Sequence, residues 1–221
     1  MLYIVSTPIG NLQDITLRAL EVLKTVDLIA AEDTRHTKIL LDHYQIATPL
    51  TSYFEHNEKN KAGHLIELLR DGKNIALVTD AGTPGISDPG YRLVNLAKEQ
   101  NIPLTVIPGP CALIAALSLS ALPMDSFVFA GFLPVKTAGR KKKFEEFKSE
   151  QRTIIFYESP HRILKTLADI AEVLPDWNVV AAREITKKFE EVRRGTAGEI
   201  LEYFKKHTLK GEFVILLKSP F

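Results

Sequence analysis

Three glycines and two prolines lie in the stretch Asp80–Gly90, which follows the continuous apolar run Ile75–Val78. A buried strand that ends in an acidic residue and feeds a helix through such a loop is where open α/β sheets bind ligands. Glycine lets backbone approach a ligand closely, and proline holds the loop in one shape. The spacing is neither the dinucleotide pattern G-x-G-x-x-G nor the phosphate-binding pattern G-x-x-x-x-G-K-[ST]. We interpret this loop as a rigid pocket wall, although the same residue types also form ordinary turns.

A second cluster, Glu32, Asp33 and Arg35, follows the apolar run Val26–Ala31, where a strand should give way to a helix. Ionisable groups this dense at a strand end indicate function, because burying them unpaired is costly and perturbed carboxylates collect at active sites. The structural alternative is that the acidic residues cap the helix expected at Lys38–Tyr44 while Arg35 pairs with one of them. The pattern does not decide between these interpretations.

The other side chains that could do chemistry are scattered. The six histidines lack metal-ligand spacing, the single cysteine Cys111 has no metal-site company, and no G-x-S-x-G nucleophile elbow occurs. His161 could act as a base, but a histidine near a helix start is more often a surface or capping residue. A pocket of backbone-rich loops suits a reaction in which a cofactor supplies reactivity and the protein supplies position. The sequence therefore favours group transfer over hydrolysis, and we expect no metal.

Apolar runs alternate with helical patterns through residues 1–122, which predicts an α/β domain with a mostly parallel sheet flanked by helices. The strand ends at Thr7, Glu32, Asp80 and Pro108 would then gather along one edge of that sheet. Strands are expected at Leu2–Val5, Val26–Ala31, Pro49–Phe54, Ile75–Val78 and Ile102–Ile107, and helices after Thr16 and at Lys38–Tyr44, Ala62–Asp71, Tyr91–Gln100 and Ala112–Ala121.

A second α/β domain is expected at residues 123–221, beyond a break at Leu122–Asp125. Its stretch Pro134–Lys148 carries six basic residues against two acidic ones, which could bind nucleic acid or form a solvated surface. Strands are expected at Phe127–Phe132, Thr153–Tyr157, Asn178–Arg183 and Glu212–Leu217, and helices at Ile163–Val173 and Ala197–Lys206.

The composition is that of an ordinary globular protein, with 45% hydrophobic and 25% charged residues in a chain of 221. The net charge of +1 means that any nucleic-acid surface is a local patch. A lone cysteine cannot form an internal disulfide and indicates a reducing compartment. No apolar run is long enough to span a membrane, and the N-terminus lacks a signal-peptide pattern. We therefore expect a cytoplasmic protein that does not associate with membranes.

Six motifs in a fixed order carry a family resemblance over nearly the whole chain. They are Ser6–Asn11, Ala31–Arg35, Thr79–Gly90, Pro108–Pro110, Phe156–Arg162 and Arg183–Lys187. The combination resembles the tetrapyrrole methylase superfamily, and within it the branch that methylates a cytidine 2'-hydroxyl in the 16S rRNA of the small ribosomal subunit. The resemblance implies two α/β domains with S-adenosylmethionine in the cleft between them, usually in a homodimer. Members of that branch often carry a further C-terminal segment, whereas this chain ends at Phe221.

The same resemblance assigns site residues by position. Loop residues of the first domain would contact the methionine and ribose parts of the cofactor, and three residues of the second domain would enclose the adenine. The cofactor contacts implied are Pro8, Asp80, Ala81, Gly82, Pro84, Ile86, Ser87, Pro108, Cys111 and Ala112, followed by Tyr157, Ala182 and Gly211. The loop at Thr7 and Pro8 would also line the substrate side.

The reaction that the resemblance implies is an in-line displacement, in which a ribose 2'-oxygen attacks the sulfonium methyl group. Because a ribose hydroxyl is a poor nucleophile, a carboxylate should accept its proton, and Glu32 or Asp33 is the candidate. Phosphates of the RNA would be held by Arg35 or by the basic run Arg140, Lys141, Lys142 and Lys143. Two alternatives stay open: a methyltransferase acting on a tetrapyrrole precursor, and a non-catalytic RNA-binding assembly factor. The motifs Glu158–Arg162 and Arg183–Lys187 favour the RNA methyltransferase.

Overall fold

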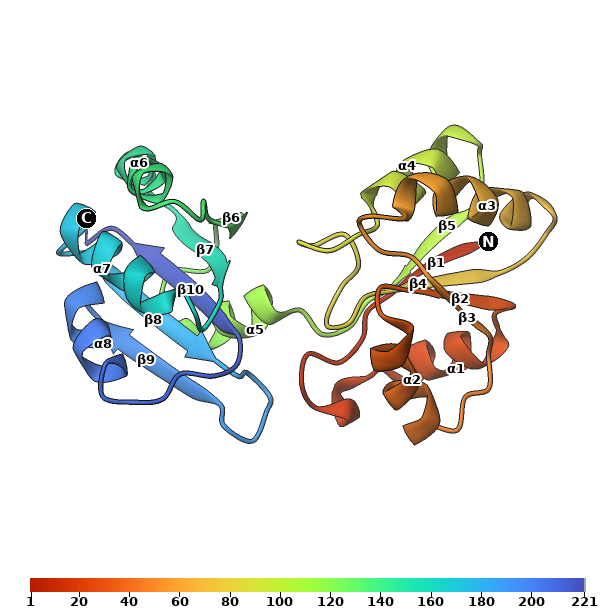
Figure 1. Cartoon of the computed structure of the whole chain (residues 1–221), viewed down its shortest axis with the longest axis horizontal. Coiled ribbons are helices and arrows are strands. Elements are labelled where there is room, and N and C mark those ends of the chain that lie inside the picture. Colours follow the sequence, from red (N-terminus) through yellow and green to blue (C-terminus); the bar gives the residue numbers. More distant parts are fainter. Residues whose placement is uncertain (221) are drawn as a thin grey trace. The chain divides into compact units, whose positions relative to one another are not determined.

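The structure is a computed structural model that describes residues 1–220 and divides into two units (Figure 1). The first unit is Met1–Cys111, and the second begins at Ala112. The expected domain boundary at residue 122 therefore differs from the observed division. Helix α5 (Ala112–Ser120) belongs to the second unit because it packs on strands of the second sheet.

The first unit is built on a five-stranded sheet with strand order β3-β2-β4-β1-β5, and every pairing in it is parallel. Parallel strands joined by helices carry helices on both faces of the sheet. Helices α1 and α2 pack on one face, and α3 and α4 pack on the other (Figure 1). The elements are β1 (Leu2–Val5), α1 (Leu17–Thr25), β2 (Leu28–Ala31), α2 (Thr34–His43), β3 (Leu50–Ser52), α3 (Glu58–Arg70), β4 (Ile75–Val78), α4 (Tyr91–Glu99) and β5 (Leu104–Ile107), with a 3-10 turn at Leu12–Asp14.

The predicted parallel sheet is confirmed, and two helices begin earlier than the sequence indicated. Helix α2 begins at Thr34 instead of Lys38 because the Asp33 side chain accepts a hydrogen bond from the backbone N–H of Arg35 and caps the helix. Helix α3 begins at Glu58 instead of Ala62. Its first turn is polar, so the spacing of apolar residues did not reveal this start.

The second unit contains a mixed sheet with strand order β6-β7-β10-β8-β9. Only β6 and β7 pair in parallel, and the other pairings are antiparallel. Helices α6, α7 and α8 share one core with this sheet, and Phe144, Leu167 and Phe204 are buried in it. The elements are α5 (Ala112–Ser120), β6 (Phe127–Phe132), α6 (Thr137–Phe147), β7 (Thr153–Glu158), α7 (Ile163–Val173), β8 (Asn178–Arg183), β9 (Glu191–Gly195), α8 (Ala197–Phe204) and β10 (Phe213–Lys218).

Strand β9 was not expected from the sequence. Its residues, Glu191 to Gly195, are mostly charged and lack the apolar pattern of a buried strand. It lies at the edge of the sheet and pairs with β8 only. Charged residues are tolerated in such an edge strand. Within residues 1–220, none of the helices combines the length and the apolar character that crossing a membrane requires.

Candidate active site

The carboxyl ends of the parallel strands bring the predicted loops of the first unit together. Thr7, after β1, forms an isolated antiparallel β-bridge with Gly82, after β4. The N–H of Thr7 donates to the carbonyl of Gly82 at 2.9 Å, and the N–H of Gly82 donates to the carbonyl of Thr7 at 3.1 Å. The Thr7 hydroxyl also donates to the carbonyl of Thr79 at 3.0 Å. The two loops are thereby fastened to each other by backbone and side chain.

A third loop, the Pro-Gly-Pro turn after β5, joins the same edge. The hydroxyls of Ser6 and Thr83 lie 2.9 Å apart, and the Thr83 hydroxyl donates to the carbonyl of Pro110 at 3.3 Å. A Cβ built on Gly109 would lie 2.9 Å from the Cβ of Ser6, so only glycine lets the turn approach this closely. The expected gathering of strand ends is therefore observed.

Three carboxylates lie at the same edge, after β2 and β4. One oxygen of Glu32 accepts the hydroxyl of Thr79 and, at 3.3 Å, the backbone N–H of Asp80. One oxygen of Asp80 in turn accepts the backbone N–H of Asp33 at 3.1 Å. Glu32 and Asp80 are half-buried, so these contacts hold two ionisable groups next to each other at the sheet edge.

Asp33 and Asp80 differ in their electrostatic surroundings. Hydrogen bonds from the side chain and backbone of Arg35 hold the pKa of Asp33 well below its usual range. Burial raises the pKa of Asp80, and the nearby charge of Glu32 raises it further, against the lowering effect of the Asp33 N–H. The structural alternative from the sequence is thus realised for Asp33, which caps α2 and pairs with Arg35 at 2.6 Å. The surroundings of Asp80 therefore disfavour its ionised form.

The glycine-rich loop offers backbone in conformations that side chains rarely allow. Gly82 and Gly85 have φ angles of +88° and +85°, and a Cβ on Gly85 would meet no atom within 4 Å. Ser87 also has a positive φ of 67°. S-adenosylmethionine carries an ammonium group, a carboxylate and ribose hydroxyls. A half-buried carboxylate at Asp80, a half-buried hydroxyl at Thr83 and open glycine backbone at Gly85 form a donor and acceptor set that fits such a group.

The hydroxyl residues of this edge were not singled out from the sequence as functional residues. Ser6, Thr79 and Thr83 fasten the loops and receive or supply hydrogen bonds at the site. Their common signal is a hydroxyl within a few residues of a predicted strand end. The other predicted positions of this unit lie on the same loops: Pro8 and Pro84 are buried, Cys111 is half-buried, and Ala81, Ile86 and Pro108 are exposed.

The residues predicted in the second unit share one side of its sheet. Tyr157 on β7 and Ala182 on β8 both pair with Val214 on the intervening strand β10, so the three side chains point to the same face. Their strand neighbours Phe156, Ala181 and Phe213 belong to the core under α6, α7 and α8. Tyr157 and Ala182 therefore lie on the face away from those helices.

Gly211, the third predicted residue of this unit, forms a tight turn against the Arg183–Lys187 motif. Its φ is +87°, and a Cβ there would lie 2.2 Å from the carboxylate of Glu184. The same carboxylate accepts the N–H of Glu212 at 3.0 Å and the ammonium of Lys187 at 2.9 Å. The motif thus shapes the turn before β10, and Gly211 is required there sterically.

The basic run predicted to bind substrate is divided by the structure. Arg140 is 1% exposed and pairs with Asp169, so this side chain does not face solvent and the expectation that it grips phosphates is wrong. Lys141 pairs with Glu172 at 2.6 Å, and Lys143 pairs with Glu146 at 2.8 Å. Sequence charge alone could not distinguish a buried cation from exposed ones. Among residues 1–220, no group of three or more His, Cys, Asp or Glu side chains could hold a metal ion.

Comparisons with known proteins agree on one family. The family model of the tetrapyrrole (corrin/porphyrin) methylases matches residues 1–201. The chain is 52% identical over 221 residues to "Ribosomal RNA small subunit methyltransferase I" of Escherichia coli O157:H7, covering 99% of this chain and 77% of that protein. The protein of the same name from Thermotoga maritima is 47% identical, and the match covers 99% of this chain and 98% of that protein.

A solved structure supports the fold. Uroporphyrin-III C-methyltransferase from Thermus thermophilus, complexed with S-adenosylhomocysteine, matches with a TM-score of 0.68 at 16% identity. That match covers 98% of this chain and 96% of the solved one, which confirms the two-unit α/β fold. With the family model matched over most of its length and relatives about half identical, this chain belongs to the tetrapyrrole (corrin/porphyrin) methylase family.

Proposed function

We propose that this chain transfers a methyl group from S-adenosylmethionine to the 2'-oxygen of a cytidine ribose in the 16S rRNA of the small ribosomal subunit. The observation that carries the proposal is the 52% identity, over 99% of this chain, to a protein named as a methyltransferase of small-subunit ribosomal RNA. The similarity to a uroporphyrin-III methyltransferase amounts to 16% identity and supports the fold alone. The RNA methyltransferase is therefore favoured over both the tetrapyrrole enzyme and the non-catalytic factor.

The cofactor residues of this proposal lie on loops of the first unit and, in the second unit, on α5, β7, β8 and the turn before β10. When bound, S-adenosylmethionine supplies an activated methyl group on a positively charged sulfur. Residues of the first unit contact its methionine and ribose parts, since their loops are fastened together and expose glycine backbone. The residues assigned are Pro8, Asp80, Ala81, Gly82, Pro84, Ile86, Ser87 and Pro108, with Cys111 and with Ala112 at the start of α5, and Tyr157, Ala182 and Gly211 for the adenine.

Glu32 is the better of the two candidates for accepting the proton of the ribose hydroxyl. Asp33 is committed to capping α2 and to its ion pair with Arg35, and its depressed pKa makes it a weak proton acceptor. Glu32 accepts the Thr79 hydroxyl and the Asp80 N–H on one oxygen, Oε2, which orients the carboxylate against the end of β4. Glu32 thus combines a fixed position with proton-accepting chemistry at the loop edge.

Exposed cations of both units are available for the RNA backbone. The side chain of Arg35 is 89% exposed although it pairs with Asp33, and Lys142 is exposed on α6. Lys141 and Lys143 can exchange a carboxylate partner for a phosphate because both ion pairs lie at the surface. We further propose that the protein works as a homodimer in the cytoplasm, where its ribosomal substrate is found.

The experiment that tests the function supplies the protein with methyl-labelled S-adenosylmethionine and either small-subunit RNA or a uroporphyrinogen. The proposal expects label in the RNA only. Label in the tetrapyrrole, or cofactor binding with label in neither acceptor, contradicts it.

A further inference from the structure

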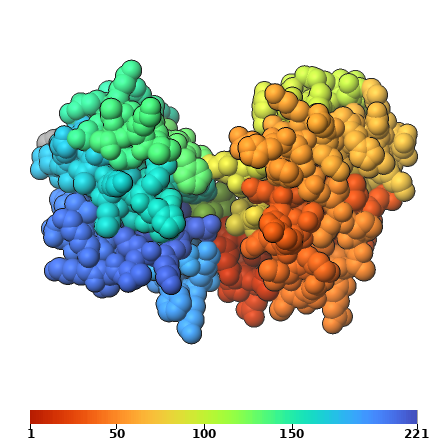
Figure 2. All heavy atoms as spheres, viewed as in Figure 1, coloured from red at the N-terminus to blue at the C-terminus, as the bar shows by residue number. Residues whose placement is uncertain are grey.

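The connection between β6 and α6 exposes apolar side chains in the second unit. In residues 132–136, here called the 132–136 segment, Phe132 is 57% exposed and Val135 is 76% exposed. Leu133 alone is buried, at 3%, and it anchors the segment in the core. In Figure 2, green atoms, whose colour corresponds to residues near 130, lie at the surface of this unit. Exposed large apolar groups on a well-held segment indicate a contact surface.

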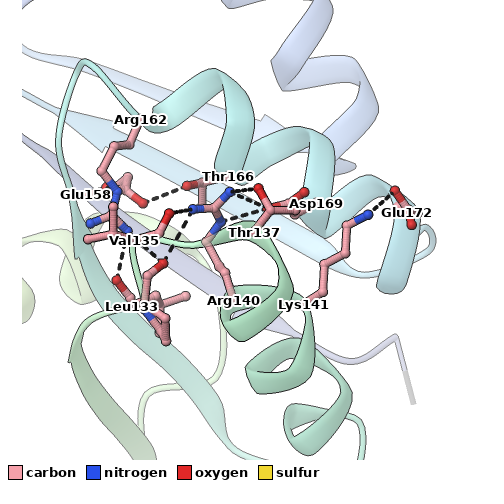
Figure 3. A network of polar contacts seen from close by, with 11 residues as sticks. Leu133, Val135, Thr137, Arg140, Lys141, Glu158, Arg162, Thr166, Asp169 and Glu172 are labelled. Carbon is pink, nitrogen blue, oxygen red and sulfur yellow. Dashed lines mark hydrogen bonds and ion pairs between the residues drawn. The ribbon is translucent and has the colours of Figure 1, made fainter.

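Two arginines fix the backbone of this segment. Arg162 donates to the carbonyl of Leu133 at 2.8 Å and to that of Pro134 at 3.3 Å. Arg140 donates to the carbonyls of Pro134 at 3.4 Å and Val135 at 3.1 Å. Three consecutive carbonyls are thus held by two guanidinium groups, and Figure 3 labels Leu133 and Val135 among them.

Buried carboxylates hold the two arginines in turn. Arg140 pairs with Asp169 of α7, and the Nε of Arg162 lies 3.1 Å from Glu158 at the end of β7. Glu158 has a fully buried side chain and also accepts the hydroxyl of Thr166 at 2.6 Å (Figure 3). The segment is therefore immobilised from three elements, and its exposed side chains are preorganised before any partner arrives.

The exposed groups suit an unpaired nucleotide. The ring of Phe132 meets Tyr157 edge-on, with centroids 5.7 Å apart and planes at 63°, while more than half of the residue stays exposed. Aromatic faces stack on nucleobases, and lysines pair with phosphates. Of the five basic residues from Ser126 to Phe144, Arg140 is buried against Asp169 and two lysines pair with carboxylates, so the exposed unpaired charge of the described residues there comes from Lys136 and Lys142. Within residues 1–220, Lys136 forms no ion pair within 4.0 Å.

We propose that the 132–136 segment receives an unpaired nucleotide of the RNA substrate, with the Phe132 ring stacked on a base and the Lys136 ammonium against a neighbouring phosphate. The inference rests on the proposed function and deepens it by naming the residues that contact the RNA. Tyr157, which Phe132 touches, is also the residue assigned to the adenine of the cofactor.

The test compares RNA binding by Phe132→Ala and Phe132→Trp with that by Phe189→Ala. Phe189 is the matched control because it is an exposed phenylalanine of the same unit, at 67%, outside the segment. Phe132→Ala should weaken binding of a small-subunit RNA fragment roughly 5- to 150-fold, the effect of losing one base–aromatic stack. Phe132→Trp and Phe189→Ala should bind RNA like the parent protein, and all three should bind S-adenosylmethionine like the parent.

The salt dependence of RNA binding tests the role of Lys136. Lys136→Gln should reduce the slope of log affinity against log salt by about 0.7, the value for one phosphate contact on a single strand. Lys24→Gln, which removes an exposed lysine of α1, should leave the slope unchanged.

The outcomes separate this inference from the proposed function. If the parent protein binds and methylates the RNA while Phe132→Ala binds it within twofold of the parent, the inference fails alone. Loss of cofactor and RNA binding in parallel would show a structural role for Phe132 and also overturn it. A parent protein that neither binds nor methylates the RNA contradicts the proposed function, and this inference with it.

Discussion

Three neighbouring carboxylates, which the proposed chemistry uses, have different electrostatic and hydrogen-bonding surroundings. Arg35 lowers the pKa of Asp33, whereas burial raises that of Asp80. Glu32 accepts hydrogen bonds from Thr79 and from the backbone of Asp80, which fixes its position. Pairs of carboxyl groups whose environments differ in this way are typical of sites that handle protons.

Glu32→Gln should separate proton acceptance from positioning. Glutamine keeps an oxygen that can accept the Thr79 hydroxyl and the Asp80 N–H, but it cannot accept a proton from the ribose. We expect turnover to fall roughly 10²- to 10⁴-fold, the usual contribution of a general base, with little change in cofactor affinity. Asp33→Asn is the matched control because asparagine also caps helices well, and it should affect turnover much less. Full turnover in Glu32→Gln would remove Glu32 from the mechanism.

Asp80→Asn should raise stability at neutral pH while it weakens cofactor binding. The pKa of Asp80 is raised in the folded protein, so the folded state holds this proton more tightly than the unfolded chain. Stability is therefore lost as pH rises from below the usual value of 3.8 through the raised pKa. Asparagine removes that loss and can keep the hydrogen bond from Asp33.

Urea unfolding of the parent and Asp80→Asn proteins across a pH series checks this expectation. The stability difference should favour the variant at pH 7 and shrink at pH values below 3.8. A variant that is less stable than the parent at pH 7 would show that ionised Asp80 is stabilising in the folded protein.

At the scale of elements, the β6–α6 connection depends on a buried ion pair. Arg140 and Asp169 have side chains that are 1% and 9% exposed. Removing one partner of such a pair leaves an uncompensated buried charge. Arg140→Met should therefore lower the free energy of unfolding by about 3 to 5 kcal/mol.

Two variants control this prediction. Lys141→Met, on the same helix, removes a surface ion pair with Glu172 and should cost no more than about 1 kcal/mol. The double variant Arg140→Met with Asp169→Leu should be more stable than Arg140→Met alone, because no unpaired charge stays buried. Denaturant unfolding measures all three, and a double variant less stable than the single one would contradict the account.

Local patterns predicted most elements because each depends on its own residues. The all-buried run Ile75–Val78 and the loop after it predicted β4 and the sheet edge where the strand-end loops meet, without knowledge of contacts. Strand β9 was not predicted because its mostly charged residues lack the apolar pattern by which a strand is recognised. Arg140 was assigned to RNA because its partner, Asp169, lies 29 residues further along the chain. Whether a single cation is buried depends on tertiary structure, and a count of charges along the sequence cannot show it.

At the scale of the whole molecule, each unit has its own sheet and its own hydrophobic core. The first unit contributes loops fastened by hydrogen bonds at one sheet edge, and the second contributes a basic helix behind a rigid apolar segment. In the proposed function, the first unit handles the proton and the second unit contacts the RNA. The family membership and the proposed substrate are consistent with this division.

The most direct test of the central claim is methyl transfer from labelled S-adenosylmethionine to small ribosomal subunits from cells that lack the endogenous enzyme, with the labelled atom mapped. The account predicts label on a cytidine ribose 2'-oxygen of 16S rRNA. Label on a base, or S-adenosylmethionine binding without any label in the RNA, would contradict it.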